Sequence, residues 1–134
     1  MRIGQYELDA ESPAVFVAEI GGNHNGSVQE AIQLSVSAIG AGAQAVKFQK
    51  RTPELCVPEH VRNEMCDTPW GRMTYMQYRH RMEFGRSEYD TLANALCALG
   101  IPWFVSVWDE GAVDFMEFYG PPCYKVPSPC LTDQ

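Results

Sequence analysis

The fold is decided by the sequence VFVAEIGGNHNGS at residues 15–27. Its apolar beginning predicts a buried strand over residues 14–20. Ser27, followed three residues later by Glu30, predicts a capping box that starts a helix. The polar residues between the two elements, above all Glu19, Asn23 and His24, therefore follow a strand directly. Because ligands bind at the carboxyl ends of strands in α/β sheets, we expect a functional site here. The alternative is a polar turn whose glycines only reverse the chain.

The rest of the sequence alternates predicted strands and helices. The start of the chain predicts a short strand or half of a small hairpin. Apolar spacing and helix-stop signals then place the remaining elements. The expected elements are a strand or hairpin over 3–8, a helix over 27–39, a strand over 44–49, a helix over 70–84, a helix over 87–99 with Ser87 as its N-cap, a strand over 103–107, a helix over 110–119 capped by Asp109, and a strand over 123–126.

Strands separated by helices predict an α/β fold with parallel strands and right-handed crossovers. Two architectures fit this order: a four-stranded doubly wound sheet, or the first half of a (β/α)8 barrel. A complete barrel needs about 250 residues. At 134 residues, this chain can supply half of one.

Composition narrows the class of protein. Apolar residues make up 46% of the chain and charged residues 20%, as in a single globular domain. The net charge of −7 argues against nucleic acid and against an anionic membrane surface as partners. We find no membrane-spanning stretch and no signal peptide. The five cysteines have no metal-ligand spacing, which favours a reducing cytoplasm, and Cys97 is expected to be a small core residue.

A long connection, residues 50–86, interrupts the simple alternation. Connections of this length are usually functional. Arg72, Arg79, His80 and Arg81 could contact an anionic substrate there. We favour the alternative, in which these charges form a solvated face and the neighbouring methionines and tyrosines pack.

Several polar side chains fall at strand carboxyl ends and should meet at one edge of the sheet. They are Glu19, Asn23, His24, Lys47, Gln49, Ser106, Lys125 and Ser128. Lysine is rarely buried unless it is paired or meets an anion, so Lys47 is a candidate ligand for one. Two lysines with hydroxyl groups suit a phosphate and a carboxylate. A Schiff-base role for Lys47 or Lys125 remains open.

Three segments, residues 18–26, 42–49 and 124–128, resemble the sialic acid synthase family. The resemblance runs along nearly the whole chain in the same order and spacing. It implies a TIM-barrel enzyme that condenses phosphoenolpyruvate with N-acetylmannosamine or a related N-acetylated amino sugar to give a nonulosonic acid. The residues do not discriminate between N-acetylmannosamine and the precursors of legionaminic or pseudaminic acid.

The resemblance also implies roles for individual residues. Lys47 would meet the carboxylate of phosphoenolpyruvate, and Lys125 and Ser128 would hold its phosphate. Glu19 and Gln49 would face the sugar. Asn23 and His24 would shape the turn beside the sugar, and Ser106 would complete the binding site. Pro127 and Pro129, which flank Ser128, depart from the family pattern.

A divalent metal, manganese or magnesium, is implied as a cofactor. Its histidine ligands belong to later strands of the barrel, and a C-terminal antifreeze-like domain reaches across a dimer. Residues 1–134 are therefore expected to be the N-terminal part of the barrel, strands one to four, without the metal-binding half or the antifreeze-like domain. We expect a homodimer or a complementing C-terminal half as partner. The alternative is a non-catalytic half-barrel that serves as a binding or assembly module and dimerises through its open sheet edges.

Overall fold

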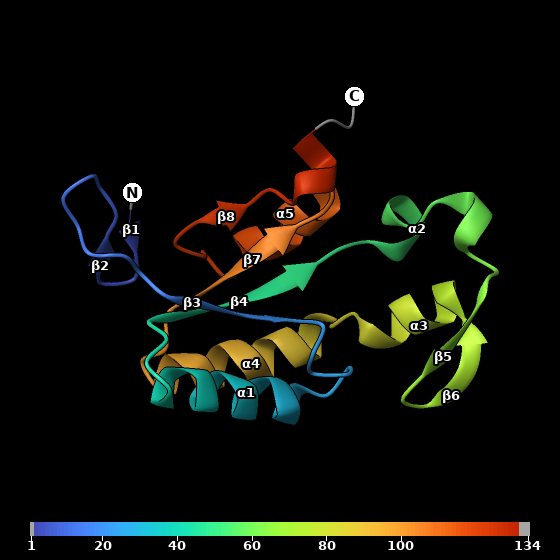
Figure 1. Ribbon diagram of the computed structural model, residues 1–134, viewed down its shortest axis with the longest axis horizontal. Helices are drawn as coiled ribbons and strands as arrows, with labels where there is room; N and C mark the ends of the chain where they lie inside the picture. Colours follow the sequence, from blue (N-terminus) through green and yellow to red (C-terminus); the bar gives the residue numbers. More distant parts are fainter. Residues whose placement is uncertain (1, 132–134) are drawn as a thin grey trace.

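The computed structural model describes residues 2–131 and has a parallel sheet at its centre (Figure 1). Four strands pair in the order β3-β4-β7-β8, each parallel to its neighbour. Their bounds are β3 Val17–Gly21, β4 Ala45–Lys50, β7 Trp103–Val107 and β8 Tyr124–Lys125. The helices that connect them are α1 Val28–Gly40, α4 Arg86–Ala98 and α5 Glu110–Glu117. This order confirms the predicted parallel α/β fold.

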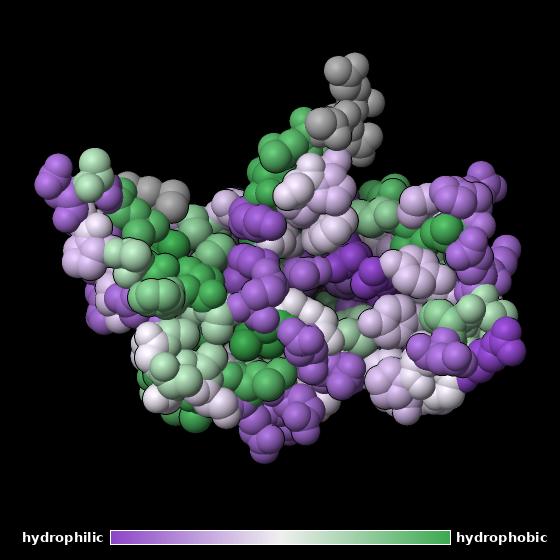
Figure 2. All heavy atoms as spheres, viewed as in Figure 1, coloured by the Kyte–Doolittle hydropathy of each residue, from purple (hydrophilic) through white to green (hydrophobic). Residues whose placement is uncertain are grey.

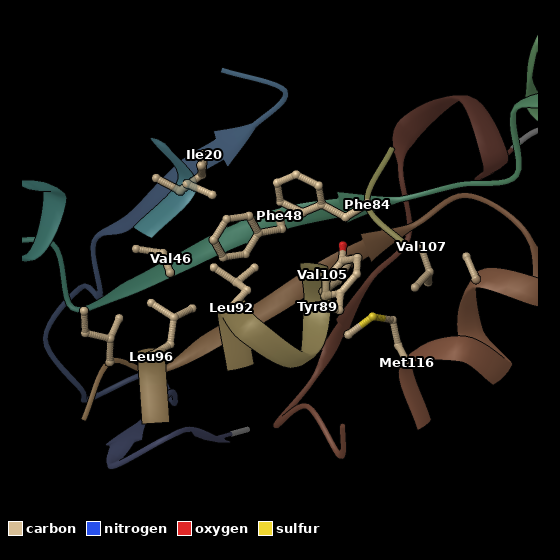
Figure 3. Packing of buried hydrophobic residues seen from close by; sticks show 13 residues of the cluster. Ile20, Val46, Phe48, Phe84, Tyr89, Leu92, Leu96, Val105, Val107 and Met116 are labelled. Atoms are coloured by element: carbon tan, nitrogen blue, oxygen red, sulfur yellow. The ribbon is translucent and has the colours of Figure 1, made fainter. Parts of the chain in front are cut away.

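One face of the sheet carries the hydrophobic core. Alternate strand residues, among them Ile20, Val46 and Val105, pack against side chains of α1, α4 and α5 in a single cluster (Figure 3). Tyr89 and Leu92 of α4 lie fully buried within it. Because all three helices cover the same face, the fold is that of a partial barrel and not a doubly wound sheet, which has helices on both faces.

The opposite face, which corresponds to the inside of a barrel, differs between its two ends. At the amino end of the strands, Ala45 and Phe104 form a small apolar cluster with Ile3. Ile3 belongs to the N-terminal hairpin, in which β1 (Arg2–Ile3) pairs with β2 (Tyr6–Glu7), as predicted. At the carboxyl end the same face is polar. The hairpin thus closes one end of this face and leaves the other end for a site.

The long connection between β4 and α4 is built differently from the prediction. The expected helix over 70–84 was wrong in its first part: β5 (Met65–Thr68) and β6 (Gly71–Thr74) form an antiparallel hairpin. Gly71 has φ of +101° in the turn, which a helix excludes. Thr74 and Gln77 then form a capping box that starts α3 (Tyr75–Met82). Two short helical turns, α2 (Pro53–Cys56) and η1 (Glu59–Val61), precede the hairpin.

Two further expectations need correction. Helix α4 begins at Arg86 with Gly85 as its N-cap, and not after Ser87, because the Glu88 carboxylate accepts a hydrogen bond from the Gly85 N–H at 3.1 Å. Cys97 is exposed because it follows the buried Leu96 and so lies about 100° around the helix from it. All five cysteines are free thiols.

The capping box predicted at the start of α1 is half formed. Ser27 accepts a hydrogen bond from the Glu30 N–H at 3.3 Å, but its own N–H donates to the His24 carbonyl at 2.9 Å. The last described element is η2 (Ser128–Leu131). Within residues 2–131, no helix is long and apolar enough to cross a membrane.

We predict that Leu92→Ala lowers the free energy of unfolding by about 2–5 kcal/mol, because it leaves a cavity between α4 and the sheet. Leu99→Ala is the matched control: Leu99 follows the same helix and is 53% exposed. Its cost should be no more than about 0.5 kcal/mol. Urea denaturation followed by circular dichroism measures both, and equal losses would contradict this account of the core.

Candidate functional site

The centre of the site is the buried side chain of Lys47, on the polar face of β4. It forms an ion pair with Glu19 of β3, and its Nζ donates to Ser106 Oγ of β7 at 2.6 Å. The strand register requires this arrangement, because Glu19 is the Cα partner of Lys47 in the parallel pair. Burial lowers the pKa of Lys47, while the neighbouring Glu19 carboxylate opposes that shift. Lys47 is therefore buried among polar partners.

Lys125 lies on the next strand, at the open side of this cluster. It is the Cα partner of Ser106 in the β7–β8 pair. Its positive charge is close enough to act on Lys47, whose pKa it lowers further. Ser128, by contrast, is exposed in η2 and has no described contact with the other predicted site residues. The structure thus gathers Glu19, Lys47, Ser106 and Lys125, and leaves Ser128 apart.

The turn between β3 and α1 is held by His24. Its ring is buried and stacked on Phe84 at 4.1 Å between centroids, and its Nδ1 accepts a hydrogen bond from the Gly26 N–H at 3.1 Å. Burial lowers the pKa of His24 to about 4. The ring is therefore neutral at physiological pH and positions the turn. Asn23 is exposed, and its Nδ2 donates to the Ile20 carbonyl at 3.1 Å, so it too stabilises the turn.

Two glycines let this turn approach its neighbours closely. Gly21 has φ of +52°, and a Cβ there would lie 2.9 Å from Glu19 Oε1 and 3.1 Å from Gln49 Nε2. Gly26 has φ of +68°, and a Cβ would lie 2.3 Å from the Arg81 carbonyl oxygen at the end of α3. The positive φ disfavours a side chain at both positions, and at Gly26 the Arg81 carbonyl leaves no space for one. The turn is thereby pressed between the Lys47 cluster and α3.

A second group of polar residues surrounds a hollow of about 450 Å³ beside the turn. Figure 2 shows hydrophilic surface around a depression on this side of the molecule. The hollow is lined by residues of the β3–α1 turn, the end of β4, helix α3 and the segment after β7: Gly21, Gly22, Asn23, His24, Asn25, Gln49, Arg51, Tyr78, Arg79, Met82, Glu83 and Trp108. Three of the predicted site residues, Asn23, His24 and Gln49, are among them, and so is Arg79, for which a solvated face was expected.

Arg51 is the main residue of this hollow that the sequence analysis missed. It is buried, its Nε lies 2.8 Å from Glu83 Oε1, and its guanidinium lies 4.3 Å from the centre of the Trp108 ring. It also donates to Gln49 Oε1. Burial raises the pKa of Glu83, an effect that the positive charges of Arg51 and Lys50 oppose. This network fixes the amide of Gln49, which the sequence analysis placed beside the sugar.

The other charged residues of the connection have structural partners. His80 Nε2 lies 2.9 Å from Glu54 Oε1, and the Arg81 guanidinium stacks at 4.4 Å on the Trp70 ring. Arg72 is exposed in the hairpin. Only Arg79, among the four basic residues considered, lines the hollow. Arg79 also packs, because its guanidinium stacks on the rings of Tyr75 and Tyr78.

Asp109, which follows the hollow-lining Trp108, links the segment after β7 to the start of the long connection after β4. Its carboxylate accepts hydrogen bonds from the N–H groups of Ala112 at 2.8 Å and Thr52 at 2.6 Å, so it caps α5, as predicted, and also fixes the start of α2. Burial opposes ionisation of Asp109, but these hydrogen bonds outweigh it and lower its pKa. Trp108, which precedes Asp109, is held in place under Arg51 as a result.

Comparison with known proteins shows the family to which the sequence is similar. The family described as NeuB matches residues 34–134. N-acetylneuraminate-9-phosphate synthase of Mus musculus is 32% identical over 123 residues, which cover 90% of this chain and 34% of that protein. N,N'-diacetyllegionaminic acid synthase of Legionella pneumophila is 30% identical over 120 residues, covering 87% and 33%. This chain thus spans about a third of the length of these relatives.

A solved structure shares the fold. The N-acetylneuraminic acid synthetase of Leptospira borgpetersenii, crystallised in complex with citrate, superposes with a TM-score of 0.74 at 22% sequence identity. The superposition covers 94% of this chain and 40% of that one.

The low pKa of His24 predicts a pH dependence of stability. The unfolded histidine, with pKa near 6.5, binds a proton before the folded one, with pKa about 4. The stabilisation is therefore complete above pH 6.5 and is lost as the pH falls toward 4. The loss should be on the order of 2 kcal/mol after allowance for solvent screening.

Urea denaturation of the wild type and of His24→Gln at several pH values isolates this contribution as the difference between the two proteins. NMR titration of the His24 ring should give a midpoint near 4. A midpoint near 6.5 would contradict the buried, neutral ring.

Proposed function

This chain belongs to the NeuB family, and we propose that it is the phosphoenolpyruvate-binding part of a synthase that makes a nonulosonic acid. The reaction would condense phosphoenolpyruvate with N-acetylmannosamine or a related N-acetylated amino sugar. The observation that supports this proposal most strongly is the polar cluster of Glu19, Lys47 and Ser106, with Lys125 beside it, at the carboxyl ends of three parallel strands and their neighbour.

Phosphoenolpyruvate carries its carboxylate and its phosphate on the same carbon, C2, and this cluster offers two ammonium groups on neighbouring positions. Lys47 is poised to meet the carboxylate and the exposed Lys125 to meet the phosphate. Ser106 already accepts a hydrogen bond from Lys47 within the cluster, and Ser128 would have to approach Lys125 to share the phosphate. Holding both anionic groups fixes the orientation of the enol carbon, which is the reacting atom.

The sugar would lie next to this anion, against Glu19 and Gln49. The C3 carbon of phosphoenolpyruvate attacks the aldehyde carbon of the sugar, whose oxygen takes up a proton to become a hydroxyl group. Water adds at C2, and the C2–oxygen bond to phosphate breaks to leave a ketone. The Gln49 amide, fixed by Arg51, would orient the sugar for this attack.

A Schiff-base mechanism suits the cluster less well. An attacking amine must be neutral with a free electron pair, whereas Lys47 Nζ donates to both Glu19 and Ser106. That donor pattern is typical of an ammonium group that holds an anion. Trapping with pyruvate and borohydride tests the Schiff base directly.

The divalent metal of the family finds no ligand set here. Across residues 2–131, no three His, Cys, Asp or Glu side chains come together in a way that could hold a metal ion. We therefore assign the described residues to binding and orientation of the substrates only. Partnership with a second copy or a complementing half, and a cytoplasmic location, remain predictions.

We predict that phosphoenolpyruvate binds the chain and that Lys125→Ala weakens its binding by about 10- to 100-fold, because a charge-assisted contact to the phosphate is lost. Lys125 is exposed, so the variant should fold normally. Arg72→Ala, which removes one positive charge from the exposed hairpin, is the matched control and should bind as the wild type does.

Calorimetric titration of phosphoenolpyruvate into the three proteins measures the effect. Equal affinity in Lys125→Ala and the wild type, or no binding by the wild type, would contradict the proposed function.

A further inference from the structure

Two of the five free cysteines meet at the carboxyl end of β7. Cys56 lies on α2, which follows β4, and Cys130 lies on η2, which follows β8. Both thiols donate to the backbone carbonyl oxygen of Trp108, Cys56 at 3.8 Å and Cys130 at 3.5 Å. Because both distances end at the same oxygen, the two sulfur atoms can be no further apart than their sum. The sheet order explains the meeting, since β4 and β8 are the two neighbours of β7.

The two thiols also share a hollow, here called the cysteine hollow. Its volume is about 460 Å³, and Cys56, Cys130 and Trp108 all line it. Both cysteine side chains are half-buried. In η2, Cys130 lies between Pro129 and Leu131, which are exposed. Cys130 is therefore the residue through which this part of η2 contacts the end of β7.

The other three cysteines have different surroundings. Cys66 donates to the Met73 carbonyl at 3.6 Å within the β5–β6 hairpin, and Cys97 is exposed on α4. Cys123 packs against the small apolar cluster that contains Ile3. Within the described residues 2–131, none of these three lines the cysteine hollow. Proximity therefore distinguishes one pair among the five thiols.

We propose that Cys56 and Cys130 are a redox-active pair that forms a reversible disulfide across the end of β7. The oxidant is a low-molecular-weight disulfide of the glutathione class, and the reaction is thiol–disulfide exchange. The thiolate of one cysteine attacks a sulfur of the oxidant, whose S–S bond breaks and releases one thiolate. The second cysteine loses its proton and attacks the mixed disulfide, which forms the bond between Cys56 and Cys130 and releases the second thiolate. The protein gives up two electrons and two protons, and the oxidant is reduced to two thiols.

The surroundings of Cys56 set the order of the two steps. Its Sγ donates to Asp109 Oδ2 at 3.4 Å. Burial raises the pKa of Cys56 to about 11, and the Asp109 carboxylate adds to this effect. Because the thiolate is the nucleophile, Cys130 makes the first attack at neutral pH. Cys56 then resolves the mixed disulfide, and its proton passes to solvent.

Formation of the bond needs only local movement. An S–S bond is about 2 Å long, so the two sulfur atoms must come closer together. Rotation from one staggered rotamer to the next moves a cysteine sulfur by about 3 Å. The hydrogen bonds to the Trp108 carbonyl resist this rotation little, because a thiol is a weak donor. The bond then ties the connection after β4 to the segment after β8, at the edge of the sheet that carries the site.

Incubation of the folded chain with oxidised glutathione tests this pair. After acid quenching, the remaining thiols are alkylated and the protein is digested for mass spectrometry. We expect a peptide in which Cys56 is linked to Cys130, and we expect dithiothreitol to reverse the link. The oxidised protein should unfold at a higher urea concentration, because the cross-link restricts the unfolded chain. Thiol exchange needs no substrate, so the outcome does not depend on the proposed function.

Two controls show whether the fold selects the pair. In denaturing urea the same incubation should link Cys56 to Cys130 no more often than it links other pairs. Cys97→Ser removes an exposed thiol outside the cysteine hollow and should leave the link unchanged. The proposal is overturned if the folded wild type yields glutathione adducts or free thiols at both positions without the link. It is also overturned if the folded protein links other pairs equally often.

Two further variants test the order of attack. Cys56→Ser removes the resolving thiol and should accumulate glutathione on Cys130. Cys130→Ser should leave Cys56 largely unmodified over the same time, because its thiol stays protonated. Equal modification of the two variants would contradict the assigned order. Circular dichroism of each variant checks that it remains folded.

Discussion

The structure depends on the burial of one ammonium group. Removing a lysine from water costs several kcal/mol unless other groups compensate it. Lys47 is compensated from both sides, by Glu19 of β3 and Ser106 of β7. Because a shift of one residue would turn these side chains to the opposite face, the cluster and the core favour the same strand register. The polar site and the apolar core are thus two consequences of one alternation.

The regular elements were predictable because their apolar spacing is regular. The four central strands follow from short apolar runs, and helices α1, α4 and α5 follow from an apolar spacing of about 3.6 residues. The hairpin at Met65–Thr74 was not predictable in this way, because its Trp, Arg and Met residues fit a helical pattern when the sequence is considered alone. Its turn depends on the positive φ of Gly71 and on cross-strand pairing, and neither leaves a periodic signal.

The site was predictable where it follows the strands. Lys47, Gln49 and Ser106 were found because they end buried strands. Arg51 and Trp108 were missed, although each lies two residues beyond a predicted site residue and so shares its side of an extended chain. The alternation of side chains continues to these two residues, but they lie beyond the ends of β4 at Lys50 and of β7 at Val107, and only strand residues were considered. Glu83 could not be found in this way, since it comes from the long connection and only tertiary structure brings it to Arg51.

The two parts of the site therefore have separate structural origins. The Lys47 cluster is built from neighbouring strands, so its geometry is tied to the register of the sheet. The hollow needs α3, which is fixed by its own capping box and by the close contact of Gly26 with the Arg81 carbonyl. Substitutions on α3 can change the charge of the hollow without moving a strand. The connection after β4 can therefore change the side chains of the hollow while the register of the sheet keeps the Lys47 cluster in place.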